Sequence, residues 1–118
     1  PTVSSYAWEH YGVNWVALDP PRHLFLYSVK SLEVLAAKTG FIVENILYDS
    51  TEYQFWASEQ YIRDIPERDE RSYGENAHKS IFSREQIQEF TRKAEALNRE
   101  KKGDAICVCL AKSEREGS

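Results

Sequence analysis

An unbroken apolar run near the end of the chain, Ala-Ile-Cys-Val-Cys-Leu-Ala at 105–111, constrains the fold more than any other feature. Side chains of a strand alternate between its two faces, so a strand that is apolar at every position needs cover on both sides. We therefore expect 104–112 to be an interior strand of a layered sheet. Only one other segment, 41–48, has the β-branched and aromatic composition of a strand.

These two strands are too few to form a stable sheet alone, and the helices of the chain could cover one face of the sheet but hardly both. Partner chains could complete the sheet, or the rest of it could lie upstream of Pro1, where the chain starts abruptly without a methionine. In either case we expect apolar surface to be exposed near 104–112 and around the aromatic segment 6–18. Such surface favours self-association, including homodimers of this chain.

Capping residues and apolar periodicity predict the helices. A short helix follows Ser4 or Ser5 and ends at Gly12. The Ser-x-x-Gln spacing that starts at Ser83 is a capping box. The predicted helices are 6–11, 29–39 (after Ser28 and before Gly40), 53–62 and 84–101. The charged segment 63–80 is predicted to be a solvated loop, and 113–118 a polar tail.

Composition excludes several functional classes. The 15 Lys and Arg residues are outnumbered by 19 Asp and Glu residues, which argues against a nucleic-acid partner. No run of about 18 apolar residues is present and no secretory leader is visible, so we expect no membrane partner and a cytoplasmic location. Cys107 and Cys109 are too close in sequence for an unstrained disulfide. We expect both to be reduced core residues, and we expect no metal site.

One motif stands out in the first half of the chain: Asp-Pro-Pro-Arg-His-Leu at 19–24. Two adjacent prolines exclude a helix interior or a central strand, so the motif must lie in a loop. A helix that ends at Gly40 follows, and Phe41 then opens the first strand.

This order closely resembles the C-terminal half of class I S-adenosylmethionine-dependent methyltransferases, in the group similar to ubiquinone-biosynthesis methyltransferases. The matching residues are Pro1, Asp19 to Leu24, Ser28, Leu32 and Gly40-Phe41. The resemblance implies an α/β fold: residues 1–118 would be the C-terminal portion of one Rossmann-like methyltransferase domain. Judged as an isolated chain, it would be α+β, with helices packed on about two antiparallel strands.

The resemblance also implies a cofactor, S-adenosylmethionine, and a small-molecule methyl acceptor. The family binds its cofactor at a glycine-rich turn in the N-terminal half, and none of the five glycines here forms a Gly-x-Gly cluster. We therefore expect no cofactor-binding residue in this chain, which would depend on the missing N-terminal half and be inactive without it.

The same resemblance places the diproline loop near the mouth of the active site. His23 would then be a general base and Arg22 would bind an anionic group of the substrate, with Asp19 beside them. Alternatively, Arg22 pairs with Asp19 and His23 bonds to the backbone. Tyr11 and Trp15 could line an acceptor pocket or simply pack in the core.

A second function class stays open. The chain could be a self-contained α+β interaction module that dimerises through its sheet. A small hydrolase using His10 or His23 is a weaker alternative, because the sequence has neither a nucleophile elbow nor paired-ligand spacing.

Overall fold

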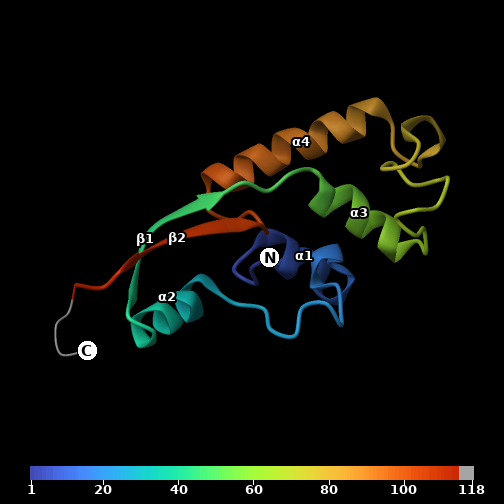
Figure 1. The fold of residues 1–118 in the computed structure, drawn as a ribbon. Coiled ribbons are helices and arrows are strands. Elements are labelled where there is room, and N and C mark those ends of the chain that lie inside the picture. Colours follow the sequence, from blue (N-terminus) through green and yellow to red (C-terminus); the bar gives the residue numbers. More distant parts are fainter. Residues whose placement is uncertain (115–118) are drawn as a thin grey trace.

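The computed structural model describes residues 1–114, and it is an α+β arrangement of four helices and a two-stranded antiparallel sheet, as predicted for the isolated chain. Helices α1, α3 and α4 gather at one end, and the β1–β2 ribbon extends from them with α2 packed against β1 (Figure 1). The elements are α1 (Tyr6–Tyr11), η1 (Gly12–Asn14), η2 (Val16–Leu18), α2 (Val29–Lys38), β1 (Phe41–Tyr48), α3 (Tyr53–Ile62), η3 (Ala77–Lys79), α4 (Arg84–Arg99) and β2 (Ile106–Lys112).

The predicted capping residues set the helix boundaries. The Ser5 hydroxyl accepts from the Trp8 amide at the start of α1, and Ser28 does the same for α2. Ser83 and Gln86 form the predicted capping box of α4. Gly40 follows α2 with a φ of 84°, a conformation that glycine adopts without steric cost.

The register of the sheet runs from Phe41 opposite Lys112 to Tyr48 opposite Ile106, with an irregularity between Val43 and Asn45. Within residues 1–114, β2 pairs with β1 alone. The interior position predicted for 104–112 would therefore need further strands and cover from outside these residues, and it stays a prediction. Among the helices of residues 1–114, α2 packs most extensively on the ribbon, against β1.

One face of the ribbon is mostly apolar and open to solvent. The register places Ile42 opposite Ala111 and Leu47 opposite Cys107, and between these pairs the polar Asn45 lies opposite Cys109. Ile42 is 53% exposed and Leu47 51%. We call the five apolar residues of this face, Ile42, Leu47, Cys107, Cys109 and Ala111, the open face. The predicted exposure of apolar surface near 104–112 is confirmed.

The cysteines lie on this open face. Cys107 is exposed and Cys109 is half-buried, and both thiols are free. The expected placement of both cysteines in the core is wrong, because within residues 1–114 no second layer covers this side of β2.

The shape of the molecule is elongated. Its radius of gyration is 17.0 Å, whereas a compact domain of this length has about 13.5 Å. Its accessible surface is 8219 Å², against about 6,600 Å² for a folded monomer of this mass. The projecting ribbon accounts for the elongation seen in Figure 1.

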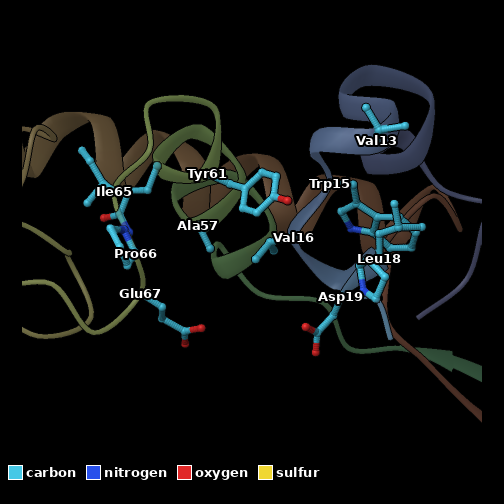
Figure 2. Close-up of a pocket in the computed structure, with 12 residues that line it drawn as sticks. Val13, Trp15, Val16, Leu18, Asp19, Ala57, Tyr61, Ile65, Pro66 and Glu67 are labelled. Carbon is cyan, nitrogen blue, oxygen red and sulfur yellow. The ribbon is translucent and has the colours of Figure 1, made fainter. Parts of the chain in front are cut away.

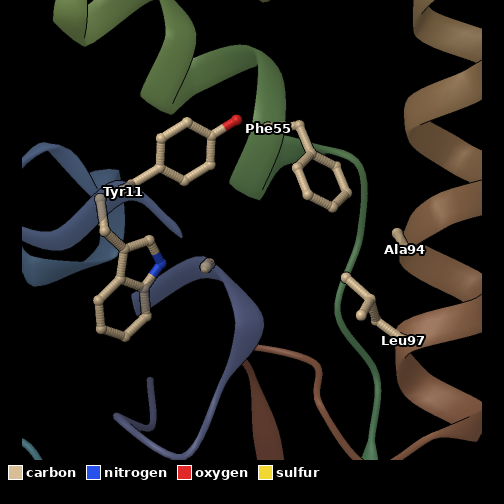
Figure 3. Packing of buried hydrophobic residues seen from close by; sticks show 6 residues of the cluster. Tyr11, Phe55, Ala94 and Leu97 are labelled. Carbon is tan, nitrogen blue, oxygen red and sulfur yellow. The ribbon is translucent and has the colours of Figure 1, made fainter. Parts of the chain in front are cut away.

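The hydrophobic core lies among the helices instead of under the sheet (Figure 3). It consists of Ala7, Tyr11, Trp15, Phe55, Ala94 and Leu97. Burying a side chain such as Phe55 contributes about 1.5–3 kcal/mol. The expectation that the aromatic segment 6–18 leaves apolar surface bare is wrong for most of its length, because α1 packs against α3 and α4 and the following loop packs against α3. Val13, which is 74% exposed, is the exception.

The charged segment 63–80 is mostly exposed, as predicted, but two of its residues are buried. Ile65 packs inward, and Ser72 accepts a hydrogen bond of 3.1 Å from Nε2 of the buried Gln60. The Gln60 Oε1 atom also accepts from the Tyr73 amide at 2.8 Å. One glutamine of α3 therefore holds this segment against the helices, and the prediction of a wholly solvated loop is wrong at these positions.

Candidate functional site

A pocket of about 320 Å³ lies between the loop that follows α1 and the C-terminal end of α3 (Figure 2). One wall comes from the loop and the other from α3 and the residues after it. The loop contributes Val13, Trp15, Val16, Leu18, Asp19 and Pro20, and the opposite wall contributes Ala57, Gln60, Tyr61, Ile65, Pro66 and Glu67.

The loop wall is held in place by two anchors. The Val16 amide donates to the Ser58 hydroxyl at 3.0 Å, which ties η2 to α3. Trp15 is 1% exposed, and its indole Nε1 donates to the carboxylate of the buried Asp104 at 3.0 Å. The second anchor joins the loop to the segment that leads into β2, 89 residues along the chain. The pocket is thus built on fixed elements.

The diproline motif forms a tight turn at the edge of this wall. Asp19 adopts a left-handed conformation and the Pro20–Pro21 bond is cis. The Arg22 amide donates to the Asp19 carbonyl at 3.0 Å, and Arg22 Nη1 donates to Asp19 Oδ2 at 3.2 Å. Of the two interpretations of Arg22, its pairing with Asp19 is the one that the structure contains. The Arg22 side chain is 81% exposed.

The structure brings together two of the five predicted site residues. Trp15 and Asp19 line the pocket, whereas Arg22 and His23 are exposed beside it and are not among its lining residues. Tyr11 lies in the core, where burial and then the charge of Glu59 raise the pKa of its phenol.

Sequence reasoning missed Glu67 and Tyr53. Glu67 sits on the wall opposite Asp19, and its Oε2 accepts a hydrogen bond of 3.1 Å from the Tyr53 hydroxyl. Burial of the ring, followed by the charge and hydrogen bond of Glu67 and the charges of Asp19 and Asp104, raises the pKa of Tyr53 to about 12. No local sequence pattern identifies Glu67 as a site residue. It lies 48 residues from Asp19, in a charged segment whose composition is that of an ordinary solvated loop.

The pocket has mostly apolar walls and two carboxylate side chains, those of Asp19 and Glu67. In the part of the chain that the structure describes, no lysine, arginine or histidine lines this pocket. Among residues 1–114, no group of three or more histidine, cysteine, aspartate or glutamate side chains could hold a metal ion. None of the helices in this same range is long and apolar enough to cross a membrane.

The arrangement can hold a small organic molecule against fixed apolar walls and interact with a polar or charged group at the two carboxylates. Comparison of the chain with protein-family models, with curated proteins and with solved structures finds no match.

Proposed function

We propose that this chain is the C-terminal, substrate-side portion of an S-adenosylmethionine-dependent methyltransferase that acts on a small molecule. The resemblance carried by Asp19 to Leu24, the helix after them and Gly40-Phe41 supports the choice of family. The open face of the β1–β2 ribbon supports the other part of the proposal, that this chain is only a portion of the enzyme.

The open face supports a sheet that continues beyond this chain. Two strands with uncovered apolar side chains are only marginally stable in water, and about half of the Ile42 and Leu47 side chains lies open to solvent. Further strands and a covering layer from an upstream half would bury this surface. The cost of leaving it exposed would then disappear in the whole domain.

The residues present do not fit the adenosyl cofactor. Among residues 1–114, a single connection runs directly from a strand to a helix, from β1 to α3, and its residues Asp49-Ser50-Thr51-Glu52 include no glycine. Close approach of a backbone turn to the cofactor needs glycine at that point. The proposal therefore assigns the cofactor site to the upstream half, and none of its contacts to this chain.

The contribution of this chain is to bind and orient the acceptor. Methyl transfer needs the acceptor atom in line with the transferred methyl group and water kept out. The pocket between the loop and α3 offers fixed apolar walls for that task. His23, beside the pocket, is the candidate general base for an acceptor that extends past Asp19 toward the upstream half.

The test compares this chain with the same chain extended upstream by its natural coding sequence. Isothermal titration with S-adenosylmethionine should show binding to the extended protein and none to the 118-residue chain. Methyl transfer from labelled donor to a metabolite panel should follow the same division. Micromolar binding by the 118-residue chain would contradict the incompleteness. Absence of binding by the extended protein, or a start codon directly before Pro1, would contradict the methyltransferase assignment.

The same open face favours one other function, an interaction module that dimerises through its sheet. Leu47→Lys separates the two. In the module, this substitution converts a dimer of the 118-residue chain into a monomer in sedimentation experiments. In the methyltransferase, it lowers the stability of the extended protein. Gln88→Lys, at an exposed position of α4, adds the same single positive charge and is the control for both.

A further inference from the structure

The pocket between the loop and α3 carries a charge bias that neither the resemblance nor the motif specifies. Asp19 and Glu67 approach it from opposite walls, and both carboxylates lie on the same side of the pocket (Figure 2). No cationic side chain is among the twelve lining residues. A ligand in this pocket therefore meets apolar surface and two carboxylates, of which Asp19 is paired with the exposed Arg22.

The end of α3 reinforces this bias. Gln60 and Tyr61, in its last turn, line the pocket, and the C-terminal end of a helix carries a partial negative charge that favours cations. Tyr61 is an exposed aromatic residue of the same wall, and aromatic rings attract cationic groups placed over their faces. The raised pKa of Tyr53, caused by burial and by the neighbouring carboxylates, reports the same negative surroundings.

Neither carboxylate is committed to a buried partner. Glu67 forms no ion pair within residues 1–114, and its hydrogen bond comes from a neutral phenol. Asp19 pairs with Arg22 through one oxygen, Oδ2, and the Arg22 side chain is 81% exposed. An exposed pair of this kind is weak, so a ligand can share or displace it.

We propose that this pocket binds the cationic group of a small organic molecule, an ammonium or its equivalent. The charged group lies between Asp19 and Glu67, and the apolar body lies against Trp15, Val16 and Ile65. This proposal rests on the proposed function in one point only, namely that the bound molecule is the methyl acceptor. The cationic group is an anchor, and the inference assigns the methyl group to no particular atom.

Three probes of similar size and different charge test the proposal on the 118-residue chain, without any methyl donor. They are phenethylamine, 2-phenylethanol and phenylacetate at pH 7. Titration followed by amide and indole NMR shifts should show the amine binding at least about tenfold more tightly than the other two. The largest shifts should fall on the Val16 amide and the Trp15 indole. Salt at 0.5 M should weaken binding of the amine and leave the alcohol unchanged.

Two isosteric variants remove one charge each. Asp19→Asn keeps a residue type that tolerates the left-handed conformation of position 19, and Glu67→Gln keeps the length of the side chain. Each should weaken binding of the amine about fivefold to tenfold and leave the alcohol unchanged. Glu89→Gln, a carboxylate of α4 outside the pocket, is the control and should change neither. Far-ultraviolet circular dichroism checks that each variant folds.

Arg22→Ala distinguishes this inference from the anion-binding role expected from the motif. If the pocket takes a cation, freeing Asp19 leaves binding of the amine unchanged or tightens it twofold to threefold. Preferred binding of phenylacetate that is lost in Arg22→Ala would overturn the inference, and so would equal binding of all three probes or no binding up to 10 mM. Because the donor is absent from this assay, its result is independent of whether the extended protein binds S-adenosylmethionine.

Discussion

Replacing Trp15 with phenylalanine tests the anchor on which the pocket wall depends. The indole Nε1 donates to Asp104 at 3.0 Å, and both residues are buried. A hydrogen bond to a charged group contributes about 1.5–3 kcal/mol. The smaller ring also loses about 1 kcal/mol of apolar burial. Trp15→Phe should therefore lower the free energy of unfolding by about 2.5–4 kcal/mol.

A matched control isolates the hydrogen bond. Trp56 is also buried, and its ring packs edge-on against Tyr53 and Tyr73, but no hydrogen bond of its indole is found in the described residues. Trp56→Phe should therefore show the ring effect of about 1 kcal/mol alone. In the Asp104→Asn background, Trp15→Phe should lower the free energy of unfolding by less than it does in the unmodified chain, because the acceptor of the indole hydrogen bond is then neutral.

Urea unfolding followed by circular dichroism measures both differences, with the slope against denaturant checked for constancy. The reasoning is refuted if Trp15→Phe costs no more than Trp56→Phe, since the bond between Nε1 and Asp104 would then contribute nothing. A functional readout accompanies the stability. Loosening this wall should weaken binding of phenethylamine, whereas Trp56→Phe should not.

Three further perturbations have expected outcomes. Gly103→Ala should lower the unfolding free energy by about 1–3 kcal/mol in urea melts, because the new Cβ would lie 2.5 Å from the Ser50 hydroxyl. The pKa of Tyr53 is raised to about 12, so its neutral form favours the folded state. This contribution to stability should be complete below pH 10 and should be lost progressively between pH 10 and 12. Spectrophotometric titration should show the pKa of Tyr53 lowered in Glu67→Gln but still above its ordinary value, because burial, the largest cause of the shift, remains. Ser83→Ala should cost about 1 kcal/mol in thermal melts, since its hydroxyl caps α4.

The helices and strands could be predicted because their determinants are local. Ser28 and Gly40 bracket α2, and the capping box at Ser83 starts α4. These signals act within one helical turn of the residue that carries them, so a single sequence contains them in full. The predicted strand at 41–48 matches β1 for the same reason: β-branched and aromatic residues make up most of the segment, with only Glu44 and Asn45 between them.

The packing of these elements could not be predicted, because it depends on pairs far apart in the chain. Trp15 was equally compatible with a pocket wall and with the core, and it is both: the ring packs inside while Asp104 fixes its nitrogen. Glu67 became a candidate only when the turn after α3 placed it opposite Asp19. Neither arrangement leaves a periodic or spacing signal in the sequence.

The helical part of the molecule and the β1–β2 ribbon differ in how far they bury their apolar residues, and this difference connects the two proposals. The helical part buries its aromatic residues among α1, α3 and α4 and carries a pocket on that fixed base. The ribbon leaves Ile42 and Leu47 about half exposed. A pocket on the helical part should bind its ligand in the isolated chain, whereas methyl transfer, under the proposed function, should also need strands from an upstream half. Ligand binding and methyl transfer should therefore separate experimentally, with the first present and the second absent in the 118-residue chain.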